Sequence, residues 1–426
     1  MNPAARNTML AVPRPLLAGV LFLAAGAALG QDDPMDRIDD QLSFGGWNDQ
    51  VRLRVSGDLD LEGYYVTQTE PGLIFVERNA FFNPRLSLFV DAQLGSYVYA
   101  FAQVRADNGF DPGESGPRVR PDEYVLRYSP LGDGRLNLQV GKFATVVGSW
   151  TLRHGSWDNP FITAPLPYEN LTGIWDTNGA RSVEELMYWA GVRPRPVQGG
   201  AFPDQYRNLP VIWGPSYASG ASVFGEVGQI EYAAEIKNAA LSSRPGTWTP
   251  TQTQWQNPTF SGRLGYLPSE MWNVGFSASA GTYLQPEAGA TLPPGRTLGQ
   301  YREVVLGQDV SFAWHHAQLW AEVYEARFEI PGVGSADTQA YYVEAKYKLT
   351  PQFFCALRWN QQLFSSLATA DGRSAPWSRD VWRVDMGPGY RMTPHTQVKV
   401  QYSLERQKAD TGSWNSLLAI QFSARF

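Results

Sequence analysis

Arginine side chains recur at alternate positions in several short stretches of this 426-residue chain. A guanidinium group binds carboxylate or phosphate oxygens through two parallel hydrogen bonds, so such a series indicates anion binding. The candidates for an anion-binding wall are Arg52, Arg54, Arg85, Arg105 and Arg127, with Arg153 farther along the chain.

Carboxylates occupy the same polar faces as these arginines. Asp58, Asp60 and Glu62 follow Arg54, and Asp107 follows Arg105. The two signs are nearly balanced, which indicates an ion-paired wall with a weak net field. Two interpretations stay open: the arginines form a local anion track, or they pair with neighbouring carboxylates and stiffen the wall.

A second group of candidates lies in an aromatic-rich stretch from about 143 to 215, which shows no clear strand pattern. Long connections of this kind are functional or disordered, and many aromatic residues argue against disorder. We expect part of 143–181 to fold inward and narrow a pore. An external cap and a subunit contact are the alternatives. The constriction candidates are Trp150, Trp157, Asp158, Glu169 and Trp175.

The sequence gives little support for catalysis. Its four histidines are His154, His315, His316 and His395, and none belongs to an ordered triad or a nucleophile elbow. No cluster has metal-ligand spacing, and no glycine-rich phosphate loop occurs. We therefore expect no enzyme activity, no catalytic residue, no metal and no cofactor.

The polar residues lie in segments whose apolar residues also alternate. In the last segment Leu418, Ile420, Phe422, Ala424 and Phe426 share one face. A period of two is that of a strand, and about ten tilted residues cross a bilayer. A terminal phenylalanine on the apolar face resembles the C-terminal signature of bacterial outer-membrane barrels, which implies recognition by the barrel-assembly machinery.

Similar segments recur along the chain, joined alternately by short turns and long polar connections. Only a closed barrel lets strands cross lipid without unpaired backbone groups. We therefore predict an all-β fold, a transmembrane antiparallel β-barrel of about sixteen strands, wide enough for a water-filled channel. The predicted segments are 51–62, 85–91, 96–107, 122–129, 134–142, 216–226, 229–239, 258–267, 271–283, 301–313, 316–329, 338–349, 352–363, 379–393, 395–406 and 415–426.

The N-terminus has the pattern of a secretory signal peptide at 1–30, with basic residues, a short apolar run and a small-residue cleavage site. We assign 31–50 to a short periplasmic segment and 51–426 to the barrel. Aromatic residues make up 13% of the chain, which suits girdles at two membrane interfaces. The net charge of −6 gives no indication of a nucleic-acid partner.

Two short motifs carry a family resemblance. Gly141-Lys142-Phe143 ends a predicted strand before the long connection, and Asn159-Pro160-Phe161 follows within it. In these features the chain resembles the phosphate-selective porin O/P type. That resemblance implies a sixteen-stranded homotrimeric barrel in the Gram-negative outer membrane, with an arginine ladder along its pore. The lysine clusters of the family are missing here. In the alternation of this strand, Lys142 occupies a lipid-facing position.

Together these features predict an outer-membrane porin for passive diffusion of small hydrophilic solutes or ions, with a mild preference for phosphate-like anions. Two alternatives stay open. One is a carbohydrate-selective channel, in which the Trp and Tyr residues of the long connection stack on sugar rings. The other is a non-conducting structural or adhesion barrel. The expected partners are outer-membrane lipid, small solutes or anions, and two further copies of the chain.

Overall fold

The computed structural model describes residues 35, 38, 41–46, 50–67, 73, 79–108, 117–194, 204–245, 255–408 and 414–426. The expected signal peptide at 1–30 lies outside these residues. The expected periplasmic segment at 31–50 is described only in part.

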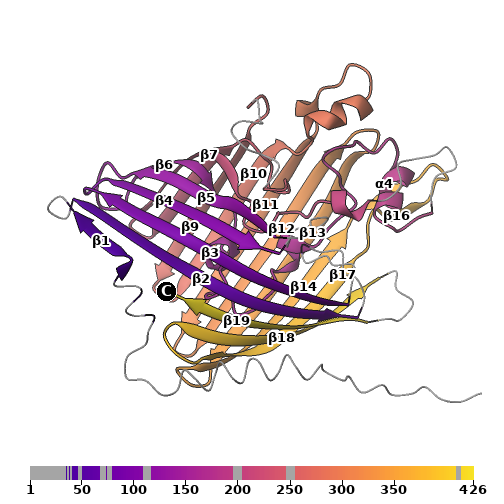
Figure 1. Ribbon diagram of the computed structural model, residues 1–426. Coiled ribbons are helices and arrows are strands. Elements are labelled where there is room, and N and C mark those ends of the chain that lie inside the picture. The colour runs from indigo at the N-terminus through magenta and orange to yellow at the C-terminus, as the bar shows by residue number, and fades with distance from the viewer. Residues whose placement is uncertain are drawn as a thin grey trace, which may run out of the picture.

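Within the described residues, sixteen antiparallel strands form one closed barrel, because β19 pairs with β2. This confirms the predicted fold class. The strands are β2 (Val51–Val66), β3 (Ala80–Leu94), β4 (Val98–Asp107), β5 (Arg118–Tyr128), β6 (Asn137–Phe143), β7 (Ala218–Val227), β8 (Ile230–Lys237), β9 (Thr259–Ser269), β10 (Trp272–Thr282), β11 (Arg302–Trp314), β12 (Ala317–Ile330), β13 (Gly334–Lys348), β14 (Phe353–Phe364), β17 (Val381–Arg391), β18 (Thr396–Gln407) and β19 (Asn415–Arg425). Figure 1 shows these strands tilted around the barrel.

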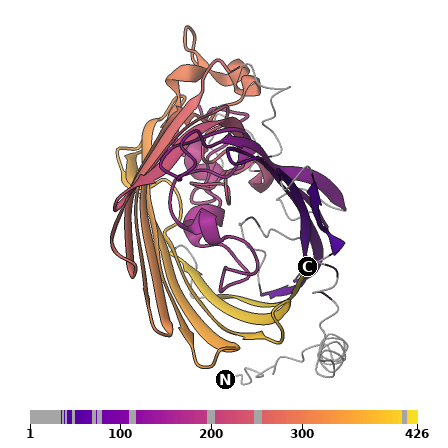
Figure 2. The same ribbon diagram turned by 90° about the vertical axis from the view of Figure 1, so that its left-hand side faces the viewer.

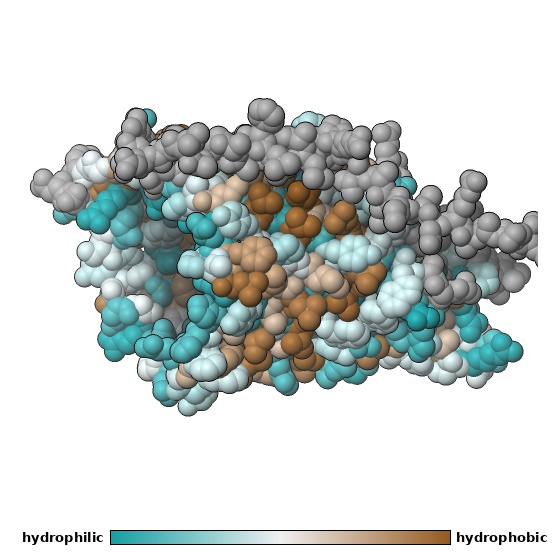
Figure 3. Space-filling view, turned by 90° about the horizontal axis from the view of Figure 1, so that it is seen from below, coloured by the Kyte–Doolittle hydropathy of each residue, from teal (hydrophilic) through white to brown (hydrophobic). Residues whose placement is uncertain are grey.

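The alternation of side chains sets the two faces of the wall. On β2, Leu59 and Tyr65 are exposed on the outside, whereas Asp60 and Glu62 are buried inside the barrel. The outer face carries a belt of apolar side chains between hydrophilic ends, brown in Figure 3. Such a belt is stable only against lipid, because exposed apolar area of this size is costly in water. Members of the belt include Leu59, Leu88, Leu126, Val140, Leu264, Phe276, Leu357 and Leu418.

Aromatic side chains gather on the outer face where the short turns join the strands. This position matches the aromatic girdle at one membrane interface, and the short turns mark the periplasmic end. The exposed aromatic residues beside these turns are Tyr128, Tyr266, Trp272, Trp314, Tyr347 and Tyr390.

The seam of the barrel lies between the first and last long strands. Phe426 and Gly57 exchange two backbone hydrogen bonds of 3.0 Å, and the Phe426 ring covers the Gly57 backbone. Strand β2 extends past this point, and the short strand β1 (Ser43–Gly46) pairs with its residues 51–54. The sequence pattern did not predict β1 or the external hairpin of β15 (Ser366–Ala368) and β16 (Ser374–Pro376).

Helical turns occur in the long connections. They are η1 (Trp150–Arg153), α3 (Leu166–Glu169), α4 (Val183–Trp189), η2 (Gln205–Arg207), η3 (Pro286–Thr291) and η4 (Leu298–Gln300). Segment 182–192 contains α4, and the Ser182 side chain caps its N-terminus. Among the described residues, no helix is long and apolar enough to cross a membrane.

Candidate functional site: the lumen and its internal segment

The connection between β6 and β7, residues 144–217, is called here the internal segment because much of it lies inside the barrel. Figure 2 shows this magenta part of the chain within the ring of strands. Its described residues are 144–194 and 204–217. The contacts that hold it there come from lumen-facing side chains of the barrel wall.

Glu322 of β12 is the first anchor. Its Oε1 accepts hydrogen bonds of 2.7 Å from the Ser149 N–H, the Ser149 hydroxyl and the Trp150 N–H. Its Oε2 accepts from the hydroxyls of Tyr168 at 2.6 Å and Tyr324 at 3.0 Å. One buried carboxylate therefore satisfies five donors and fixes both the beginning of η1 and the helix α3 against β12.

Three further wall residues hold the backbone beyond η1. Gln401 Oε1 accepts from the N–H groups of Ile162 and Thr163 at 2.7 and 3.1 Å. The Arg358 guanidinium donates to the Thr163 and Ala164 carbonyls, each at 3.1 Å. Lys399 Nζ donates to backbone carbonyls of the segment, namely those of Ser156, Asn159 and Phe161.

Arg358 is also part of a buried charge network. It pairs with Glu344 at 3.2 Å and with Asp385 at 2.8 Å, and all three side chains are fully buried. Arg383 pairs with Asp385 and with Glu169 of α3. Buried charges of this kind are tolerated only when they are paired and hydrogen-bonded, so this network is a structural clamp.

The segment reaches the periplasmic end of the lumen at Trp157. Two guanidinium groups lie over the indole ring, with the guanidinium carbon of Arg425 at 4.0 Å and that of Arg391 at 5.1 Å from the ring centroid. Asp158 is exposed beside it. A guanidinium group over an aromatic face is favourable, and more so when the pair is shielded from water.

Apolar packing fills the extracellular half of the segment. Trp175 and Trp189 stack with ring centroids 3.9 Å apart, within a buried cluster that includes Tyr168, Leu186 and Trp213. Burial raises the pKa of Asp176 to about 6, and its carboxylate accepts a hydrogen bond from Gln285. This cluster joins the internal segment to the extracellular connections around η3 and to β11, β12 and β13.

The constriction candidates have separate locations. Trp150, Trp157, Trp175 and Glu169 are buried, the last in an ion pair with Arg383. Asp158 is exposed. The tryptophans therefore pack the segment and offer no free ring face of the kind that sugar stacking needs.

The arginines that the sequence suggested for an anion-binding wall fall into two groups in the structure, one with ion pairs and one nearer the periplasmic end. Arg85 pairs with Asp60 and Glu62, at 3.0 and 2.7 Å. Arg105 pairs with Asp122 at 2.8 Å, and Arg153 pairs with Glu344 at 2.5 Å. For these three positions, the ion-paired wall describes the geometry better than an anion track does.

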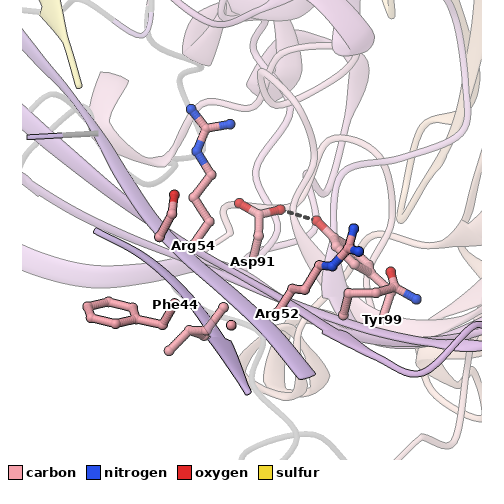
Figure 4. Close-up of a pocket in the computed structure, with 9 residues that line it drawn as sticks. Phe44, Arg52, Arg54, Asp91 and Tyr99 are labelled. Atoms are coloured by element: carbon pink, nitrogen blue, oxygen red, sulfur yellow. Dashed lines mark hydrogen bonds between the residues drawn. The ribbon is translucent and has the colours of Figure 1, made fainter. Parts of the chain in front are cut away.

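Arg52, Arg54 and Arg127 lie nearer the periplasmic end. Arg127 donates to the Gln139 side-chain oxygen at 3.1 and 2.9 Å. Arg52 and Arg54 line a cavity of about 410 Å³ together with Asp91 and Tyr99, shown in Figure 4.

The structure places four further basic residues, Lys346, Lys348, Arg391 and Arg425, at the same end of the lumen as the sequence-based candidates Arg52 and Arg54. Lumen-facing basic side chains from four strands gather at the periplasmic end, and we call them the basic rim. The alternation of side chains along β13, β17 and β19 is the sequence signal that places the added residues on the inner face. The basic rim consists of Arg52, Arg54, Lys346, Lys348, Arg391 and Arg425.

Leu152 is a second addition. It belongs to η1, between the anchors at Ser149 and Arg153, and 83% of its surface is exposed. Because the wall-facing atoms of this turn bind β12 and β13, the exposed leucine faces the open lumen. Sequence reasoning passed over it because an isolated leucine in an irregular segment carries no pattern.

His154 has hydrogen bonds to the Thr151 carbonyl at 2.5 Å and to the Tyr217 hydroxyl at 2.8 Å. Burial lowers its pKa, which favours the neutral ring. Among the described residues, no group of three or more His, Cys, Asp or Glu side chains could hold a metal ion.

Comparison of the sequence with protein-family models and with curated proteins found no match. The resemblance to the phosphate-selective porin O/P type therefore gains no support from a family model.

Solved structures do match the fold. The anion-selective porin from Comamonas acidovorans has a TM-score of 0.53 and 11% identity, covering 88% of this chain and 100% of that chain. The outer-membrane channel DcaP of Acinetobacter baumannii has a TM-score of 0.54 and 9% identity, covering 90% and 99%. OmpT of Vibrio cholerae in its trimer form has a TM-score of 0.52 and 9% identity, covering 89% and 100%. The fold of this chain is therefore that of Gram-negative outer-membrane β-barrel proteins.

Proposed function

We propose that this chain is a passive diffusion channel of the outer membrane for small hydrophilic solutes, with a mild preference for anions. The proposal rests on the basic rim at the periplasmic end of a barrel of channel-forming width. Six basic side chains stand there against the carboxylates of Asp58, Asp91 and Asp158 on the same side.

The preference is expected to be mild because the opposite side of this end is acidic. Glu226 and Glu231 lie there on β7 and β8, and Arg263 pairs with Glu231 at 3.2 Å and with Asp309 at 2.7 Å. Fixed charges of opposite sign on facing walls produce an electric field across the pore. Their sum, the net charge of this end of the pore, is small. Phosphate selectivity in particular is not needed to explain this arrangement.

Planar-bilayer recording across a KCl gradient tests the proposal. We expect the protein to conduct ions. The reversal potential should have the sign that a higher permeability for Cl⁻ than for K⁺ produces. Neutralising two members of the basic rim in Arg391→Gln/Arg425→Gln should move the potential toward zero. The matched control is Arg327→Gln, because Arg327 is exposed and pairs with Asp337 at the outer surface.

Absence of any current from a folded, inserted barrel would reject the channel and favour a structural or adhesion role. A reversal potential unaffected by the rim substitutions would reject the assigned origin of the anion preference. Block of the current by an oligosaccharide but not by small anions would favour the carbohydrate channel. We also propose a homotrimer, which light scattering of the detergent-solubilised protein tests.

A further inference from the structure

Four aromatic rings lie on the lumen side of the wall formed by β3, β4 and β7. We call them the aromatic strip: Phe89, Tyr99, Phe101 and Phe224. Phe89 and Phe101 are stacked, with ring centroids 6.2 Å apart and planes at 20°. All four are partly exposed. The inner face of an open barrel is ordinarily polar, so a run of rings there indicates contact with something apolar in the lumen.

The Arg127 side chain lies over two rings of the aromatic strip. The Arg127 guanidinium carbon lies 5.3 Å from the Tyr99 ring centroid and 4.9 Å from that of Phe224. Its Nε and one terminal nitrogen donate to the Gln139 amide oxygen. In the part of the chain that the structure describes, no carboxylate lies within ion-pair distance of Arg127. Its remaining N–H donors are therefore available to an anion.

The aromatic strip continues into the cavity at the periplasmic end. Arg52 and Arg54 line this cavity beside Tyr99, whose hydroxyl donates to the Asp91 carboxylate (Figure 4). Glu123 faces the lumen on the same wall, opposite Gln103. The three guanidinium groups of Arg52, Arg54 and Arg127 outnumber the two carboxylates of Asp91 and Glu123.

The turn η1 of the internal segment is anchored on the other side of the lumen. Its first anchor, Glu322, is on β12, and β4 lies eight strands from β12 in either direction around the barrel. The rings of the aromatic strip therefore face the part of the lumen across from η1. A solute that passes between η1 and β4 meets aromatic faces and guanidinium groups on one wall.

We propose that the aromatic strip with Arg127 and Arg52 is a binding site for small aromatic carboxylates in transit. The solute ring packs on the exposed faces of Phe89 and Phe101, and its carboxylate accepts hydrogen bonds from a guanidinium group. This inference rests on the proposed function, since it names the class of solute for that channel.

Binding to the detergent-solubilised full-length protein tests the site directly, with three probes followed by calorimetric titration. Benzoate carries the ring and the charge, acetate only the charge, and benzamide only the ring. We expect benzoate to bind more tightly than either of the others. Replacing both stacked rings in Phe89→Leu/Phe101→Leu should weaken benzoate binding by about three- to tenfold and leave acetate unchanged.

Three further variants make the test selective. Arg127→Gln should weaken benzoate and acetate together, whereas Phe101→Tyr, which retains a ring, should keep benzoate binding. Phe276→Leu is the matched control, because Phe276 lies on the lipid-facing side of β10. Heat-modified gel mobility reports whether each variant is folded.

Equal affinity for benzoate and acetate, or an equal loss in the Phe276→Leu control, would overturn this site. Such a result together with an anion-preferring current would leave the proposed function intact. Tight benzoate binding without any current would support the site and reject the channel. The two proposals therefore fail on different measurements.

Discussion

At the scale of single residues, the lumen wall holds the internal segment through buried charges with several partners each. Glu322 accepts five hydrogen bonds, and Arg358 joins two carboxylates to two backbone carbonyls. A hydrogen bond to a charged group contributes about 1.5–3 kcal/mol, roughly twice a neutral one. These wall residues are therefore where the position of the segment is most sensitive to substitution.

Glu322→Gln removes this charge while keeping the side-chain size. We expect the first turn of the internal segment to loosen, because neutral hydrogen bonds replace charge-assisted ones. Single-channel recordings should then show larger current fluctuations, and heat-modified gel mobility should report a lower unfolding temperature. Glu325→Gln, on the outer face of the same strand, is the control. Identical recordings from both variants would show that Glu322 is not the anchor.

Leu152 gives a second prediction at this scale. Because its exposed side chain faces the open lumen, Leu152→Asp should place a negative charge beside passing ions and lower the anion preference. Leu152→Asn has the same shape without the charge and should keep the original reversal potential in a KCl gradient. If the two variants gave equal potentials, Leu152 would not lie beside the ion path.

At the scale of strands, the seam between β2 and β19 depends on close contact. A Cβ atom built on Gly57 would lie 2.6 Å from the Phe426 ring, whereas one on Gly63 of the same strand meets Ile420 at 3.4 Å. The seam therefore needs glycine at position 57 of β2 and tolerates a methyl group at position 63.

Gly57→Ala should displace the Phe426 ring and lower the temperature at which the barrel unfolds in detergent gels by several degrees. Gly63→Ala is the matched control and should change it little. Equal shifts for the two variants would mean that the contact between Phe426 and Gly57 does not contribute to closure.

The sequence was informative about strands because a period of two repeats over many residues. The assignment of Asp60 and Glu62 to the polar face followed from this pattern, and both are buried inside the barrel. The internal segment has no such period. Its tryptophans could equally line a pore or pack a core, and Trp150 proved to be buried. The partner of Glu322 is 173 residues away in the chain, so no local pattern could identify it.

The contacts of the candidate site residues could not be predicted from local sequence patterns either. Residue parity placed Arg85 and Arg105 on the inner face of the strands, but their pairing with Asp60 and Asp122 depends on strand register. Register is set by turns and by packing across the barrel. Sequence reasoning therefore found the face and left the choice between a paired and a free guanidinium group open.

At the scale of the whole molecule, the barrel is asymmetric around its axis. The turn η1 and the backbone after it are held by wall residues from β12 to β18, and the aromatic strip lies on β3, β4 and β7. The basic rim lies at the periplasmic end on β13, β17, β19 and β2, so it extends from the first of these sides toward the second. We expect the proposed anion preference to come from fixed charges that face water.

Fixed charges facing water are screened by salt. The Debye length falls from about 10 Å at 0.1 M to about 3 Å at 1 M ionic strength. The anion preference, measured as a reversal potential at a constant KCl ratio, should therefore be larger in dilute than in concentrated solution. A preference independent of salt concentration would instead indicate a desolvated binding site in the path.

The internal segment also constrains the order in which the molecule can be built. It is docked by Glu322, Arg358 and Gln401, which lie 173, 195 and 239 residues later in the chain than the groups they hold. During synthesis these anchors emerge long after the segment itself, and contacts so distant in sequence form slowly. The lumen therefore reaches its final width only after the C-terminal strands have joined the wall.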